Sequence, residues 1–140
     1  MDDVNALRSI VESAPTCTLI TQGRNGNFRA RTMTRLNALE QGCLDFATDL
    51  ASNKVGEICV DRRVTLFFVD PRTRDTASLY GTGEIIEDLQ ERKCSWKEFL
   101  RHHWPQGHTD PAFVVLRVTL THGEYLLAAP EVYGKVQFGT

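Results

Sequence analysis

Ser52, Asn53 and Lys54 are three consecutive hydrogen-bond donors that follow an apolar stretch in FATDLASNK, residues 46–54. A hydroxyl, an amide and an ammonium group are together suited to holding a phosphate. The stretch also predicts a strand that ends near Thr48 and a helix that begins near Asn53, and the dipole and free N–H groups at a helix start favour an anion. It therefore predicts a phosphate site. Two alternatives remain open, namely Ser52 as a helix cap only and Lys54 as a surface cation only.

Arg29 and Arg31 form a second cationic group. They lie two residues apart in a predicted strand, so both side chains emerge on one face and can converge on a single anion. A solvated strand face is the simpler explanation of this spacing. The phosphate site predicted at residues 52–54 offers the two arginines a common ligand.

The polar residues within 102–110 could be read as a metal site, but a solvated helix end explains them better. Its candidate ligands are His102, His103, His108 and Asp110. Adjacent histidines on a helix point about 100° apart, and Pro105 interrupts the segment, so we expect no metal. The chain has no hydrolase, zinc-protease, P-loop or dinucleotide motif. The sequence thus predicts a binding site without an identifiable catalytic residue.

The elements that must position these residues are mostly short strands. A first helix, capped by Asp2 or Asp3, is predicted to end before Pro15 and to lie over one end of a barrel. Further helices are predicted over residues 53–61 and 89–103. Strands are predicted over residues 16–21, 28–38, 43–48, 63–69, 76–87, 112–121 and 123–138, the last two ranges making two or three strands.

Many short antiparallel strands with few helices predict a mainly β fold, a small β-barrel with helical insertions. A chain of 140 residues fits a single domain spanning residues 1–140. Gly81 and Gly83, within one predicted strand, indicate a bulge or a close backbone approach.

Composition limits the classes of partner. The net charge of −2 gives no broad positive field, so we expect no nucleic acid as a partner. The acidic, amphipathic start and the lack of a long apolar run predict a cytoplasmic protein with no membrane contact. The four cysteines, Cys17, Cys43, Cys59 and Cys94, are widely spaced and are expected to be reduced.

The order of these segments resembles the general stress protein 26 branch of the pyridoxamine 5'-phosphate oxidase-like proteins, from about Val4 to Tyr125. The likeness is most specific in RARTMT, residues 29–34, and in FATDLASNK. It implies a six- to seven-stranded antiparallel split β-barrel of the FMN-binding type. It also implies a two-fold homodimer that holds the flavin in the subunit interface, so that each site takes part of its wall from the partner chain.

The resemblance assigns expected roles to particular residues. The isoalloxazine ring and ribityl chain are expected to contact Arg31, Thr32, Met33 and Thr34. The phosphate tail is expected to contact Thr48, Ser52, Asn53 and Lys54. Arg29, Ala47 and Asp49 complete the expected cofactor site. Trp104 is expected to be the contribution of the partner chain, or else a hydrophobic anchor for the preceding helix.

Three departures from the family pattern qualify these expectations. Asn53 stands where oxidase members have the arginine of a Ser-Arg-Lys motif, so weaker FMN binding is expected unless Arg29 or Arg31 compensates. The C-terminal arginine and histidine that grip the substrate of true pyridoxamine phosphate oxidases have no counterpart, so vitamin B6 oxidation is not expected. Leu126 replaces a tryptophan that is frequent in this branch.

The resemblance therefore implies an FMN-dependent oxidoreductase that works with a small-molecule electron donor or acceptor. In such a protein the flavin supplies the redox chemistry, which agrees with a binding signature that lacks catalytic side chains. The alternative is a non-catalytic flavin carrier or redox sensor. A third interpretation is a barrel that binds haem or a deazaflavin.

Overall fold

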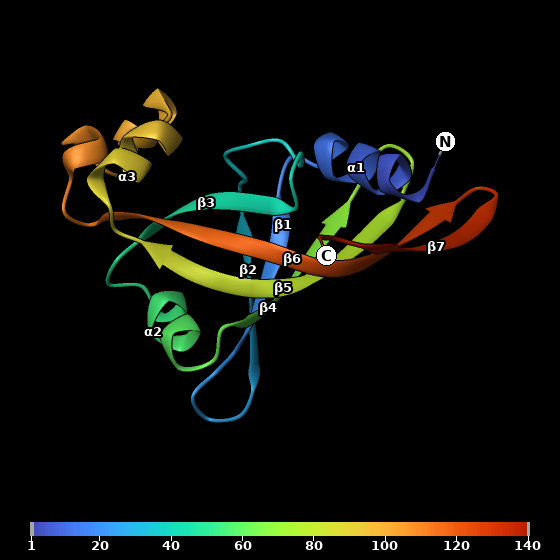
Figure 1. Cartoon of the computed structure of the whole chain (residues 1–140), viewed down its shortest axis with the longest axis horizontal. Coiled ribbons are helices and arrows are strands. Elements are labelled where there is room, and N and C mark those ends of the chain that lie inside the picture. The colour runs from blue at the N-terminus through green and yellow to red at the C-terminus, as the bar shows by residue number, and fades with distance from the viewer. Residues whose placement is uncertain (1, 140) are drawn as a thin grey trace.

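The computed structural model describes residues 2–139, whose seven strands form one antiparallel sheet that curls into a barrel (Figure 1). The helices are α1 (Asp3–Ser13), α2 (Asn53–Val60) and α3 (Leu89–Ser95), with 3-10 turns η1 (Glu98–His102) and η2 (Gly107–Thr109). The strands are β1 (Cys17–Gln22), β2 (Phe28–Met33), β3 (Cys43–Asp49), β4 (Arg63–Val69), β5 (Thr76–Ile86), β6 (Phe113–Ala128) and β7 (Glu131–Gln137). Their order is β2-β1-β4-β5-β6-β3, with β7 also beside β6. The predicted mainly β, antiparallel split barrel is confirmed.

Strand β6 holds the sheet together because it borders three other strands. One edge of this 16-residue strand pairs with β5, while the other edge pairs first with β3 and then with β7. The strand break predicted between residues 121 and 123 is wrong, because β7 takes over the hydrogen bonding where β3 ends. The bulge predicted on β5 is confirmed, since the register shifts between Tyr80 and Gly81.

The barrel closes where the chain leaves β2. The strand predicted over residues 28–38 is wrong beyond Met33, because the following residues turn away from β1 and reach β3 instead. Arg35 forms an isolated bridge with Phe46, and the Leu36 N–H donates to the Asp45 carbonyl over 2.8 Å. These bonds join the first strand in the sheet order to the last.

The predicted helix over residues 89–103 is wrong as one element. Helix α3 ends at Ser95, and the next residue, Trp96, takes an extended conformation before η1 begins. This break turns the Trp96 ring edge-on against Phe113 of β6, with ring centroids 5.1 Å apart. Packing on the barrel therefore outweighs the local helical pattern.

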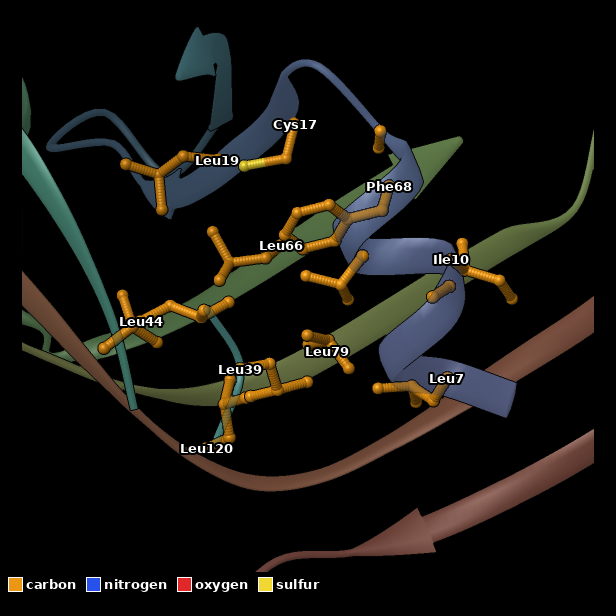
Figure 2. Close-up of a cluster of buried hydrophobic side chains, with 14 of the residues drawn as sticks. Leu7, Ile10, Cys17, Leu19, Leu39, Leu44, Leu66, Phe68, Leu79 and Leu120 are labelled. Carbon is orange, nitrogen blue, oxygen red and sulfur yellow. The ribbon is translucent and has the colours of Figure 1, made fainter. Parts of the chain in front are cut away.

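The main core lies inside the barrel, where alternate strand residues meet α1 (Figure 2). Helix α1 is capped by the Asp2 side chain, which accepts from the Asn5 N–H over 2.8 Å, and it packs its buried side chains against the sheet. All four cysteines are free, and burial raises the pKa of the Cys17 thiol to about 12. No helix within residues 2–139 is long and apolar enough to span a bilayer.

Candidate functional site

The β3–α2 turn presents side-chain hydroxyls at the start of a helix. Ser52 occupies the N-cap position of α2, yet its side chain makes no capping hydrogen bond. Its Oγ lies 3.3 Å from the Thr48 Oγ1 instead. The Asp49 carboxylate accepts from the Ala51 N–H over 2.9 Å and so fixes the turn. The sequence offered Ser52 either as a helix cap or as a phosphate ligand, and the structure shows no capping hydrogen bond from its side chain.

A cleft of about 350 Å³ lies beside this turn, and we call it the rim cleft. It is lined by Thr32, Met33, Thr34, Leu36, Ala47, Thr48, Asp49, Lys54, Phe99, Leu100, His103 and Trp104. Eight of these twelve residues belong to the site predicted from the sequence. The other four, from the segment after β2 and from the region of η1, are those that the sequence reasoning missed.

Trp104 reaches the rim cleft from its own chain. The side chain is only 8% exposed and packs on Phe113 with ring centroids 5.3 Å apart, beside Leu100. It therefore serves as the hydrophobic anchor that the sequence offered as the alternative role. Its Nε1 is buried and has no hydrogen-bond partner within residues 2–139.

Lys54 brings a cation to the polar end of the rim cleft. Burial lowers the pKa of its ammonium group, and the positive charge of Arg31 lowers it further, while Asp49 and Glu57 act in the opposite direction. An ammonium group that has lost part of its hydration beside another cation gains more than an ordinary surface lysine from an anionic ligand.

Arg29 and Arg31 do converge on one anion, as their spacing predicted, but that anion is the carboxylate of Glu57. The Arg31 Nη2 lies 2.8 Å from Glu57 Oε1, and the Arg29 Nε lies 3.1 Å from Oε2. Thr21 donates its hydroxyl to the same carboxylate over 2.8 Å. Neither arginine lines the rim cleft, and the expected contact of Arg31 with a ligand stays a prediction.

Glu57 is the site residue that sequence reasoning failed to identify. It is 4% exposed and is one of three buried residues of α2, together with Val55 and Ile58. At about 100° per residue, position 57 points away from the stripe formed by Val55, Ile58 and Cys59, so the sequence carried no local signal for its burial. Burial alone would raise the pKa of Glu57, but hydrogen bonds from Thr21 and Arg31 and the arginine charges outweigh it and lower the pKa.

A second cleft, of about 530 Å³, lies on the other side of the turn between the β1–β2 loop and α2, and we call it the hairpin cleft. It is lined by Arg24, Asn25, Arg29, Leu50, Ala51, Ser52, Asn53, Val55, Gly56 and Glu57. Three further residues predicted for the site therefore line this second cleft, namely Arg29, Ser52 and Asn53, whereas Arg31 lines neither cleft. Within residues 2–139, no three His, Cys, Asp or Glu side chains are grouped so that they could hold a metal ion.

The closed antiparallel sheet, with helical insertions at its rim, defines a split β-barrel. Residues 2–137 match the family model described as pyridoxamine 5'-phosphate oxidase like, and the chain belongs to that family. The family resemblance inferred from RARTMT and FATDLASNK is thus confirmed.

Solved structures agree with this assignment. A Clostridium acetobutylicum protein related to general stress protein 26 is 25% identical, with a TM-score of 0.83 over 96% of each chain. A heme binding protein from Mycobacterium smegmatis is 16% identical, with a TM-score of 0.78 over 98% of this chain and 58% of that one. A pyridoxamine 5'-phosphate oxidase-related, FMN binding protein from Nostoc punctiforme is 17% identical, with a TM-score of 0.67 over 98% and 93% of the two chains. The last two likenesses establish the fold alone.

Proposed function

We propose that this protein binds FMN in the rim cleft and acts as a flavin-dependent oxidoreductase other than a pyridoxamine phosphate oxidase. The observation that carries the proposal is the gathering, in one cleft, of residues from RARTMT and FATDLASNK, which lie far apart in the sequence. An FMN-binding protein of the same fold supports this choice of cofactor.

The chemistry of the cleft fits a phosphorylated flavin. Apolar and aromatic groups, including Met33, Leu100 and Trp104, supply a wall for a planar ring system. Lys54 and the Thr48 hydroxyl supply donors for a phosphate at one end, beside the start of α2, and the Ser52 hydroxyl lies next to that of Thr48 at the edge of the adjoining cleft.

A bound flavin would supply the electron transfer, and the residues of the chain would bind it, orient it and limit the access of water to it. The proposal therefore needs no nucleophile or general base among the side chains of the cleft.

We propose further that the protein is a homodimer whose partner chain covers the open side of the rim cleft. Residues opposite each other on neighbouring strands share a face, and by this rule Thr32, Thr18 and Phe67 lie together on the outside of the sheet. Large side chains exposed on the same outer face are Phe28, Phe67, Val69, Leu126 and Tyr133. Because Thr32 also lines the rim cleft, this apolar face continues into the candidate site.

The test of the cofactor is the visible spectrum and mass of the ligand that co-purifies with the protein. FMN is expected, with flavin absorption bands and the mass of the mononucleotide. A colourless protein that does not take up added FMN would contradict the proposal. Enzymatic activity is tested separately, by following the reduction of the bound flavin by NADH or NADPH and its reoxidation by an added acceptor.

Two alternatives would be recognised in the same experiments. Flavin that binds but is not turned over would identify a carrier or redox sensor. Haem binding is the other alternative, and His103 favours it because an imidazole in the rim cleft is a suitable iron ligand. A haem protein with the same fold adds support. Haem would show a Soret band, whereas a deazaflavin would be identified by its mass.

A further inference from the structure

The hairpin cleft is a second cationic cavity, and Ser52 is the residue that it shares with the FMN site proposed above. Arg24 enters it from the loop between β1 and β2, and Arg29 enters it from β2. Both guanidinium groups lie on the same side of the Ser52–Lys54 turn, away from the aromatic wall of the rim cleft.

Arg24 lies directly against helix α2. A Cβ atom built on Gly56 would be 2.7 Å from the Arg24 Nη2, so the guanidinium occupies the space into which a side chain at position 56 would project. Among the ion pairs of residues 2–139, none involves Arg24. Its charge is therefore not neutralised by a carboxylate of the described chain.

Arg29 also keeps part of its guanidinium accessible, because the side chain is 50% exposed while its Nε binds Glu57. Glu57 contributes little negative charge to the cavity. It is only 4% exposed, and both of its oxygens already accept from Thr21, Arg31 or Arg29. The accessible charge of the hairpin cleft is thus positive.

The two clefts meet at the β3–α2 turn. Thr48 lines the rim cleft and Ser52 lines the hairpin cleft, and their hydroxyl oxygens are 3.3 Å apart. A phosphate held by Ser52 and Lys54 would therefore stand at the junction, and a group joined to it would have the hairpin cleft within reach.

We infer that the hairpin cleft is a subsite for a second nucleotide phosphate, held by Arg24 and Arg29. The inference rests on the proposed flavin site, because it takes the flavin phosphate as its neighbour. Two sources share this chemistry: the second phosphate of a dinucleotide flavin such as FAD, and the phosphates of a separate adenine nucleotide bound beside FMN.

The inference is tested by titrating the protein and its Arg24→Ala variant with riboflavin, FMN and FAD, which carry none, one and two phosphates. A further arm titrates ADP into the FMN-loaded protein. Arg24→Ala is expected to raise the Kd for FAD or for ADP about five- to tenfold and to leave riboflavin and FMN within about twofold. The ligand that responds identifies the source of the phosphate.

Arg72→Ala is the matched control, because it removes an exposed arginine from the turn between β4 and β5 and lines neither cleft. An equal increase in Kd for Arg24→Ala and Arg72→Ala would show that only the overall charge of the protein matters, and it would overturn the inference. It would also be overturned if neither FAD nor ADP responded to Arg24→Ala, or if FMN weakened as much as FAD did.

A second variant keeps the charge and changes only its position. Gly56→Ala places a methyl group where the Arg24 guanidinium lies, and it is expected to weaken the same ligand by about two- to fivefold without unfolding α2. If the proposed FMN site itself were wrong, the wild-type protein would bind FMN no better than riboflavin. That result is distinct from a failure of the second phosphate subsite alone.

Discussion

At the scale of single residues, the structure divides the cations predicted for one site into two groups. Lys54 remains available at the end of the rim cleft, whereas Arg31 is bound to Glu57. A strand spacing that brings two side chains to one face does not reveal which anion they meet. Here the anion comes from the chain itself, so in the proposed site recognition of an external phosphate would depend mainly on Lys54 and on the hydroxyls of the turn.

Lys54→Ala is expected to weaken FMN binding by about 1–3 kcal/mol, the range for a charge-assisted hydrogen bond. Riboflavin, which lacks the phosphate, should bind equally well to the variant and the wild type. Fluorescence titration of both ligands measures this difference. Equal losses for riboflavin and FMN would show that Lys54 supports the cleft rather than the phosphate.

Glu57→Gln is expected to lower the free energy of unfolding at pH 7 by about 1–3 kcal/mol, because two guanidinium groups lose their counter-charge. The pKa of Glu57 is lowered in the folded state, so its stabilising effect is complete above its ordinary value of 4.5 and is lost as pH falls through the folded pKa. Urea unfolding between pH 3 and pH 7 should show a shallower acid dependence for the variant.

The control for Glu57→Gln is Glu84→Gln, which alters an exposed carboxylate on β5. It should leave both the stability and its acid dependence nearly unchanged. If Glu57→Gln matched this control, the buried ion pair would not contribute to folding.

At the scale of elements, the glycines of β5 control how closely the strand approaches its neighbours. A Cβ on Gly81 would lie 2.1 Å from the Thr119 carbonyl oxygen of β6, which is backbone and cannot move aside. On Gly83 the nearest atoms, 3.2 Å away, are methyl groups of Ile58 and Leu116. An added methyl group would therefore meet rigid backbone at Gly81 but movable side chains at Gly83, although both positions face the barrel interior.

Gly81→Ala is accordingly expected to destabilise the protein by about 3 kcal/mol, and Gly83→Ala by only about 1 kcal/mol. Chemical denaturation followed by circular dichroism measures both changes. Equal losses at the two positions would mean that the bulge at Tyr80 and Gly81 adapts to the added methyl group.

The elements also show what sequence patterns can and cannot predict here. The hairpin of β1 and β2, the strand-to-helix turn at residues 46–54 and the bulge at Gly81 follow from local residue types, and all three were predicted. The end of β2 and the break after α3 were missed, because they depend on barrel closure and on the contact of Trp96 with Phe113. Pairings over such distances leave no local pattern.

In the candidate site, too, residues with a local sequence signal were predicted and residues defined by tertiary neighbours were not. Residues of the β3–α2 turn were found because their types and order are unusual for a strand end. Glu57 and Arg24 were missed, since each gains its role from a neighbour that is close only in the folded chain, namely Arg31 for Glu57 and Gly56 for Arg24.

At the scale of the whole molecule, the outer face of the sheet is the surface proposed for the second subunit. Phe67 lies near its middle, opposite Thr18 on one side and Ser78 on the other. An apolar side chain that is 36% exposed there gains further burial if a second copy covers it. Dimerisation would then enclose the ligand as well as the apolar face.

Phe67→Arg is expected to convert the proposed dimer to a monomer and to weaken FMN binding, because a charged side chain would replace an apolar one in the buried interface. Analytical ultracentrifugation with and without FMN measures both effects. Leu89→Arg, on the exposed start of α3, is the control and should remain dimeric. A monomeric wild type at micromolar concentration would contradict the proposed assembly.

The position of β6 in the chain also has a consequence for how the protein is made. Residues 113–128 border β3, β5 and β7, so they complete the barrel although they follow β3 and β5 in the chain. Until they emerge from the ribosome, the edges of β3 and β5 are unpaired and the interior is open to water. The nascent chain therefore cannot close the barrel before β6 has emerged, and during that interval its open strand edges are exposed to pairing with other chains.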